Sequence, residues 1–205
     1  MSGRRVFAVL LGLLLVVGGS RADGPAWRDG DIVFQTSRST QSLAVQKATG
    51  SPYSHMGMVF MRGNRPYVFE AAGQVQYTPL SSWLARGIGG HVVVKRLRDG
   101  EARLDPSAIE RLRRAAKAFE GRPYDLAFAW SDERIYCSEL VWKIYQRALG
   151  IELGGLQRIR EFNLGDPAVQ QKVSERYGKR VPLDELAISP VAIFNSPHLL
   201  TVLER

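Results

Sequence analysis

The stretch HMGMVFMRGNRPYVFEAA, residues 55–72, consists of two apolar runs separated by a short polar segment. The runs are rich in residues that favour strands, and Gly63 and Asn64 lie at the centre of the segment between them, where a tight turn needs them. The pattern predicts an antiparallel hairpin. With the turn centred on Gly63 and Asn64, His55 and Glu70 become diagonal neighbours on one face, close enough for the carboxylate to hold the imidazole. A slip of one residue would place them on opposite faces.

A second decisive stretch is YCSELV, residues 136–141, which opens a predicted helix that ends at Gly150. Cys137 is the only cysteine of the chain. The N-terminus of a helix favours an anion such as a thiolate, and a nucleophilic cysteine also needs a histidine as its partner. Of His55, His91 and His198, only His55 has a carboxylate placed to orient it by the hairpin geometry. A Cys at a helix start, a His on the adjoining sheet and an acid behind the His are typical of thiol acyl transfer.

Each of these residues also has a plainer interpretation. A lone cysteine is often a small buried hydrophobe, His55 can simply begin a strand, and Glu70 can be a surface residue of the sheet. The histidines lack the spacing of zinc ligands, so the sequence predicts no metal site, and the chemistry above needs no cofactor.

Working outward from these stretches, the pattern predicts an α+β fold with a largely antiparallel central sheet packed against helices. Residues 151–205 carry no visible chemistry, and their Ser-Pro pairs at 189–190 and 196–197 indicate a strand-and-turn cap over the sheet. The further predicted strands are 32–34, 74–77, 91–95 and 199–203, and the further predicted helices are 39–50, 79–86, 106–121 and 167–177.

The N-terminus has the pattern of a signal peptide. Arg4 and Arg5 precede a twelve-residue apolar run, and small residues lead up to Ala22. We therefore expect residues 1–22 to be a signal peptide cleaved after Ala22, residues 23–205 to form one domain, and the protein to be exported to the periplasm or secreted. The alternative is an uncleaved N-terminal anchor, although the run is shorter than the roughly 20 residues that span a bilayer.

Composition excludes several classes of protein. The 205 residues are 45% hydrophobic and 23% charged, which is typical of a globular domain and not of a disordered or multi-pass membrane chain. The net charge of +8 would permit peripheral contact with an anionic envelope surface. The densest basic stretch, residues 110–117, has helical spacing that leaves its charges on a solvated face, and no aromatic residues alternate with them. We therefore expect no nucleic-acid partner.

Several stretches together resemble one known family. They are GDIVFQ (30–35), SPYSHMGMV (51–59), YVFEA (67–71), GRPYD (121–125) and YCSELV (136–141). As a set, and in this order, they are similar to the YiiX-like group of circularly permuted NlpC-type cysteine hydrolases, which have a papain-like fold. In ordinary papain-like enzymes the cysteine helix precedes the histidine strand, whereas here His55 comes first.

The resemblance implies that Cys137 is the nucleophile, His55 the base and then the acid, and Glu70 the residue that orients His55. We expect the backbone N–H of Cys137 and the hydroxyl of Tyr53 to bind the oxyanion, with Tyr136 and Tyr124 as rival donors.

The substrate implied for an exported member is the amide bond of a short peptide or of a cell-wall stem peptide. Lipid and N-acyl substrates, cleaved or transferred with the same triad, are the alternative, because relatives in the permuted branch handle acyl lipids. Phe34, Met56, Met58, Met61 and Trp83 are candidates for an acyl pocket, although a strand of methionines is also typical of plain core. A non-catalytic envelope-binding module is a third possibility.

Overall fold

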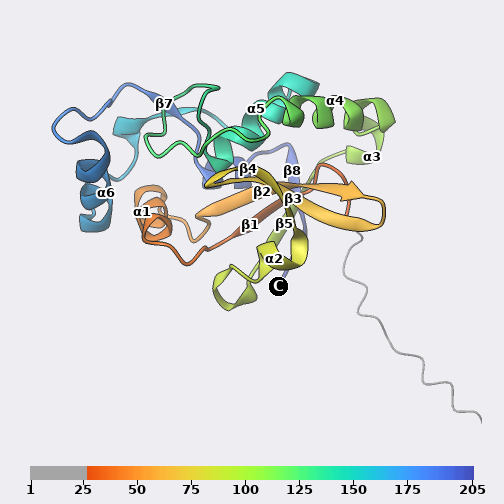
Figure 1. Ribbon diagram of the computed structural model, residues 1–205, viewed down its shortest axis with the longest axis horizontal. Coiled ribbons are helices and arrows are strands. Elements are labelled where there is room, and N and C mark those ends of the chain that lie inside the picture. Colours follow the sequence, from red (N-terminus) through yellow and green to blue (C-terminus); the bar gives the residue numbers. More distant parts are fainter. Residues whose placement is uncertain (1–26) are drawn as a thin grey trace, which may run out of the picture.

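Six strands form one antiparallel sheet at the centre of the molecule, seen in the computed structural model, which describes residues 27–205 (Figure 1). The strand order is β4-β3-β2-β1-β5-β8, and each neighbouring pair is antiparallel. The bounds are β1 Ile32–Gln35, β2 His55–Arg62, β3 Arg65–Ala72, β4 Gln74–Pro79, β5 Val93–Leu97 and β8 Leu199–Glu204. The predicted fold class is therefore confirmed.

The register of the central hairpin is the predicted one. Met58 pairs with Phe69 and Val59 with Val68, which places the turn at Gly63 and Asn64. Gly57 allows the two strands to approach, since a Cβ atom at this position would lie 2.4 Å from the Val68 side chain. The hairpin therefore fixes which side chains share a face at its open end.

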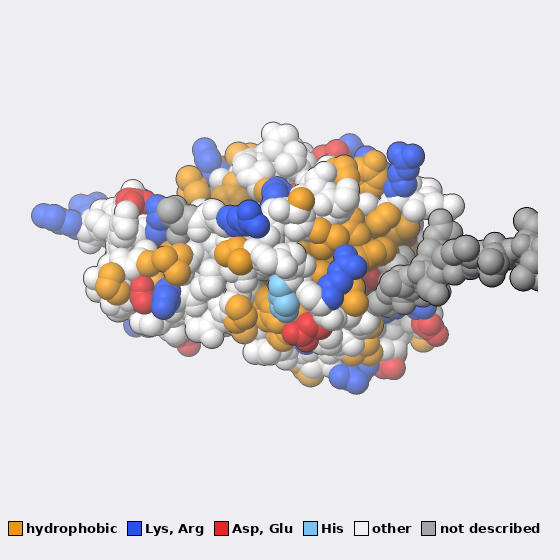
Figure 2. All heavy atoms as spheres, turned by 90° about the horizontal axis from the view of Figure 1, so that it is seen from below, with side chains coloured by type: hydrophobic (Ala, Val, Ile, Leu, Met, Phe, Trp, Pro, Cys, Tyr) orange, Lys and Arg blue, Asp and Glu red, His pale blue; other side chains and the backbone are white. Residues whose placement is uncertain are grey.

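Helices cover the sheet unequally. On one face, α5 (Cys137–Leu149) packs against β2 and β3, and α4 (Pro106–Lys117) lies against α5 (Figure 1). The core between them is fully buried and includes Phe34, Met56, Met58, Leu140 and Ile144. The opposite face carries a smaller buried cluster that includes Trp83 of α2 (Leu80–Leu84). Figure 2 looks at this side, and Lys and Arg side chains are scattered over it and do not form one patch.

A second group of helices lies at one end of the sheet. There α1 (Thr40–Thr49) packs against α6 (Pro167–Tyr177). Ser39 caps α1 by accepting a hydrogen bond from the Ser42 N–H, and Asp166 caps α6 in the same way. Among residues 27–205, no helix combines the length and the apolar character needed to cross a bilayer.

Some predicted bounds are wrong. The helix predicted at 79–86 covers only Leu80–Leu84, and the helix predicted at 106–121 ends at Lys117. The strand predicted at 91–95 begins two residues later, at Val93. The predicted cap over the sheet is instead α7 (Pro190–Phe194), which packs against α5, preceded by a separate two-stranded sheet of β6 (Gln157–Arg158) and β7 (Leu186–Ala187). Ser189 as N-cap and Pro190 at the first turn start this helix, a signal that the sequence contains. A short helix α3 (Gly100–Arg103) was also not predicted.

Candidate active site

Cys137 is the first residue of α5 and is 5% exposed. Tyr136 precedes it in an extended conformation and does not cap the helix with its side chain. Its hydroxyl instead accepts a hydrogen bond from the Ile188 N–H at 3.0 Å, and Ser138 donates to the Ile188 carbonyl at 2.8 Å. The segment between β7 and α7 therefore anchors the first turn of α5, which also carries the buried carboxylate of Glu139. The sulfur lies at the positive end of the helix dipole.

His55 and Glu70 lie side by side across the hairpin, with 2.6 Å between His55 Nε2 and Glu70 Oε2. Glu70 has no exposed surface, and its other oxygen accepts hydrogen bonds from Thr78, at 2.6 Å, and from Arg86. A buried carboxylate held by three donors is fixed in position and stays ionised. These bonds outweigh burial, which alone would raise the pKa of Glu70, and leave that pKa below its ordinary value.

The third member of the group is Cys137, which is close enough to His55 to raise the pKa of the imidazole. Since Nε2 is engaged with Glu70, Nδ1 is the ring nitrogen left for the sulfur. Burial alone would lower the pKa of His55. Hydrogen bonds and negative charge from Cys137 and Glu70 have a larger, opposite effect and raise the pKa to about 9. The imidazole is thus held as a cation at neutral pH, in a position to give up a proton near the sulfur.

The three tyrosines named as oxyanion donors lie in different places. Tyr53 stacks on Phe194, with ring centroids 4.3 Å apart, and lines neither of the cavities beside Cys137, so the structure does not bring it to the sulfur. The hydroxyl of Tyr136 accepts a hydrogen bond from the Ile188 N–H, and this residue lines only the apolar pocket. Tyr124 lines both cavities.

Tyr124 is placed well for this role. Its hydroxyl accepts a hydrogen bond from Gln41 Nε2 at 2.8 Å, which leaves its own proton free to donate. Burial, followed by the negative charge of Cys137, raises the pKa of Tyr124 well above its ordinary value, so the hydroxyl stays protonated. Both cavities at the site are lined by this residue.

These two cavities meet at the reacting groups and differ in character. One is an open cleft of about 680 Å³ that His55 lines together with several polar and basic side chains. The other is an apolar pocket of about 110 Å³ that Cys137 lines. Ser54 and Tyr124 line both, so the two cavities adjoin each other, one with His55 and the other with Cys137 in its wall.

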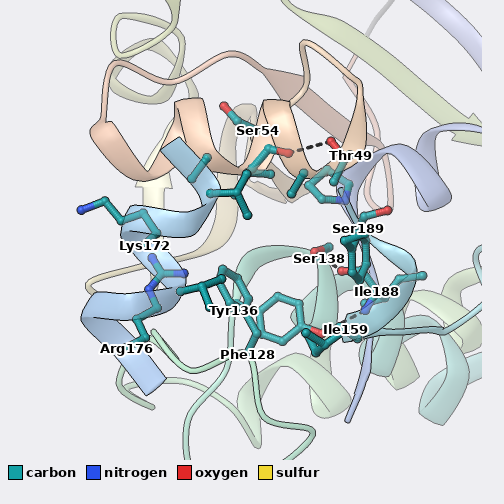
Figure 3. A pocket seen from close by; sticks show the side chains of 18 of the residues that line it. Thr49, Ser54, Phe128, Tyr136, Ser138, Ile159, Lys172, Arg176, Ile188 and Ser189 are labelled. Carbon is teal, nitrogen blue, oxygen red and sulfur yellow. Dashed lines mark hydrogen bonds between the residues drawn. The ribbon is translucent and has the colours of Figure 1, made fainter. Parts of the chain in front are cut away.

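Figure 3 shows the apolar pocket, with Lys172 and Arg176 of α6 on one side and Ile188 and Ser189 on the other. The residues expected to form an acyl pocket are elsewhere. Phe34, Met56, Met58 and Trp83 are buried in the core, and Met61 packs against the cluster on the far face of the sheet. The walls of the pocket come from α1, α6, the loop before α5 with the start of that helix, and the segment before α7. Pairing rules within the sheet cannot place these elements.

Thr78, Arg86 and Gln35 also belong to the site, although the sequence analysis did not identify them. Thr78 could have been found by continuing the register into β4, where Glu70 faces Gln76 and Thr78 is its diagonal neighbour. Arg86 follows a short helix and reaches Glu70 from outside the sheet. No sequence pattern places it there.

A sheet that carries a histidine and its acid, packed on a helix that begins with a cysteine, defines a papain-like cysteine hydrolase whose elements occur in permuted order. The model of one family, described as "Permuted papain-like amidase enzyme, YaeF/YiiX, C92 family", matches residues 26–203. The chain belongs to this family, whose members are papain-like cysteine amidases.

Two relatives agree with this assignment. The chain is 51% identical to the protein named "Uncharacterized protein YiiX" of Escherichia coli K12 over 179 residues, which are 86% of this chain and 87% of the relative. It also matches a crystal structure titled as the metalloprotein YiiX from Escherichia coli O157:H7, with a TM-score of 0.84 and 51% identity, over 88% of this chain and 98% of that one. Within residues 27–205, no three His, Cys, Asp or Glu side chains cluster closely enough to hold a metal ion, so these residues do not fit a metal centre.

Proposed function

We propose that this protein is an exported cysteine amidase in which Cys137, His55 and Glu70 form the catalytic triad. The Cys137 thiolate attacks the carbonyl carbon of an amide, and a C–S bond forms while the carbonyl oxygen becomes an oxyanion. The N–H of Cys137 and the hydroxyl of Tyr124 stabilise this oxyanion. The C–N bond then breaks, and protonated His55 gives its proton to the leaving nitrogen, leaving a thioester.

Water completes the cycle. Neutral His55 takes a proton from water as the oxygen attacks the thioester, and cleavage of the C–S bond releases the acid and restores the thiolate. Glu70 keeps the imidazole oriented and stabilises its charged form in both halves of the reaction.

The observation that carries the proposal is the position of Glu70. This carboxylate has no exposed surface, lies 2.6 Å from His55 Nε2, and is itself held by Thr78 and Arg86. A buried charge is costly unless it is paired, and a purely binding module has no need of an oriented imidazolium. The arrangement therefore favours a catalyst over a non-catalytic envelope-binding module.

For the substrate, we propose a short peptide or a cell-wall stem peptide, in keeping with the family's amidase chemistry and the signal-like N-terminus. A second candidate, a lipid or other N-acyl substrate, is favoured by one observation. The surface of the pocket that Cys137 lines is mostly apolar, with Phe128, Phe162 and Ile188 in its walls, although Lys172 and Arg176 lie on one side. An acyl chain or an apolar side chain on the carbonyl side of the scissile bond fits such a pocket.

Intact-protein mass spectrometry tests the proposal. Wild type is mixed with stem-peptide fragments or with N-acyl amides, and samples quenched within milliseconds to seconds are examined for a mass increase equal to the acyl group. We expect this adduct and free amine from one substrate class, and neither from Cys137→Ala. Equal release of amine by Cys137→Ala would remove Cys137 from the mechanism.

A further inference from the structure

The open cleft on the His55 side is lined by basic residues without acidic ones. Arg38, Arg86 and Arg134 line it, and no Asp or Glu does. Arg86 is bound to Glu70, whereas neither Arg38 nor Arg134 has a carboxylate partner within residues 27–205. Two exposed guanidinium groups without counter-charges beside a reacting centre attract an anion to that cleft.

Gln35 adds a polar group to the same wall. It faces His55 across the β1–β2 pair, is 1% exposed, and lines the cleft. Neither its Nε2 nor its Oε1 has a hydrogen-bond partner in the described part of the chain. Buried amides are normally paired, so Gln35 is a polar group in the wall of the cleft that lacks the hydrogen bonds such groups usually make.

The chemistry of the reaction decides which part of the substrate enters the cleft. His55 must reach the leaving nitrogen to protonate it, so the amine product lies on the side that His55 lines. The acyl group stays on the sulfur and lies on the side that Cys137 lines, in the apolar pocket. The two ends of the substrate therefore meet different surroundings.

We infer that the leaving amine carries an anionic group, a carboxylate or a phosphate, which Arg38 and Arg134 bind while the acyl part occupies the apolar pocket. The inference rests on the proposed amidase reaction for its orientation, and it narrows the substrate to an amide between an apolar acyl group and an anionic amine. An amino acid or peptide supplies the anion as a carboxylate, and a phosphoethanolamine headgroup supplies it as a phosphate.

Equilibrium binding to the full chain with Cys137→Ala tests the anion site without catalysis. The ligands share a hexanoyl group and differ only in the amine: N-hexanoylglycine, its carboxamide, and N-hexanoyl-phosphoethanolamine. Hydrogen bonds to charged groups predict that at least one anion binds about 10-fold or more tightly than the carboxamide. Added salt should reduce that ratio, because both arginines are exposed. Comparison of the two anions shows whether carboxylate or phosphate is preferred.

The double substitution Arg38→Gln and Arg134→Gln should abolish the preference for the anion. The matched control, Arg65→Gln at the hairpin turn, should keep it. Equal affinity for the three ligands, including no measurable binding of any, or a preference that survives the double substitution, overturns the inference.

Turnover by wild type separates this result from the proposed function. Preferential binding of the anion without hydrolysis by wild type would leave the anion site in place and count against the amidase reaction. Hydrolysis by wild type without preferential binding of the anion would support the amidase reaction and count against the anion site.

Discussion

Glu70 is the residue on which the chemistry of the site depends most strongly. Its side chain is completely buried, and the donors around it account for both of its oxygens: His55 on one, Thr78 and Arg86 on the other. The charge on Glu70 in turn helps raise the pKa of His55 to about 9. Removal of that charge should therefore lower the pKa of His55 as well as the stability of the protein.

We predict that Glu70→Gln lowers kcat/KM by about 100-fold, the lower end of what a positioned acid or base contributes. An NMR titration of the imidazole should show a lower pKa for His55, which a merely structural defect would not produce. Gln76→Ala, at the position opposite Glu70 on β4, is the matched control and should leave that titration unchanged. An unchanged His55 pKa in Glu70→Gln would contradict the assigned role.

The raised pKa of His55 also predicts how stability depends on pH. Because protonated His55 is favoured in the folded state, its contribution is complete below the unfolded pKa of about 6.5 and is lost as pH rises through about 9. The free-energy difference between wild type and His55→Gln should therefore be larger at pH 6 than at pH 10, by about 3 kcal/mol at most. Urea denaturation at both pH values measures it, and a difference that grows with pH would show that the sign is wrong.

The roles proposed for single residues could be predicted from the sequence only where a regular element places them. His55 and Glu70 follow from hairpin register, and Cys137 follows from a helix start. Tyr53 is near His55 in sequence, but its ring packs against Phe194 of α7, a helix that no prediction from the sequence includes. Tyr124 lies in the loop before α5, where no periodicity indicates which way a side chain points.

At the scale of elements, the site depends on how closely β2 and β3 approach. At Gly57, an added Cβ atom would lie 2.4 Å from Val68 Cγ1 and 2.9 Å from the Phe69 carbonyl oxygen. The second contact is with backbone, so a side chain here would push the strands apart close to His55. A hairpin with the same hydrogen bonds but wider spacing would hold His55 and Glu70 less precisely.

We therefore predict that Gly57→Ala lowers the free energy of unfolding by about 1–3 kcal/mol, the usual cost of overpacking. Activity per folded molecule should fall as well. Gly155→Ala is the control, because a Cβ atom there meets nothing within 4 Å. Urea denaturation compares the two variants. Equal midpoints would show that the sheet accommodates the added Cβ atom at position 57 without loss of stability, which would contradict the prediction.

The antiparallel sheet and the succession of strands and helices along the chain could be predicted because their signals are local: alternating apolar residues, turn residues and helix caps. The β6–β7 pair could not be predicted, since two-residue strands carry no periodicity. The apolar pocket could not be predicted either, because its walls come from four separate parts of the chain.

For the whole molecule, the untested expectation is export. The predicted signal peptide, residues 1–22, lies outside the described residues, which begin at Trp27 and include the entire catalytic group. We propose that the mature protein begins at Asp23. Expression of the full chain in a Gram-negative host, followed by fractionation and intact mass measurement, should give a periplasmic or secreted species that lacks the first 22 residues. A full-length species in the membrane fraction would support the uncleaved anchor instead.

The whole account requires that His55 activates Cys137 across a fold that brings together residues far apart in sequence. The most direct test is the rate at which iodoacetamide alkylates Cys137 at pH 7 in wild type and in His55→Ala, with circular dichroism confirming that both are folded. The account predicts that wild type reacts at least about 10-fold faster, because only the thiolate is alkylated and the imidazolium favours it. Equal rates in two folded proteins would contradict the account.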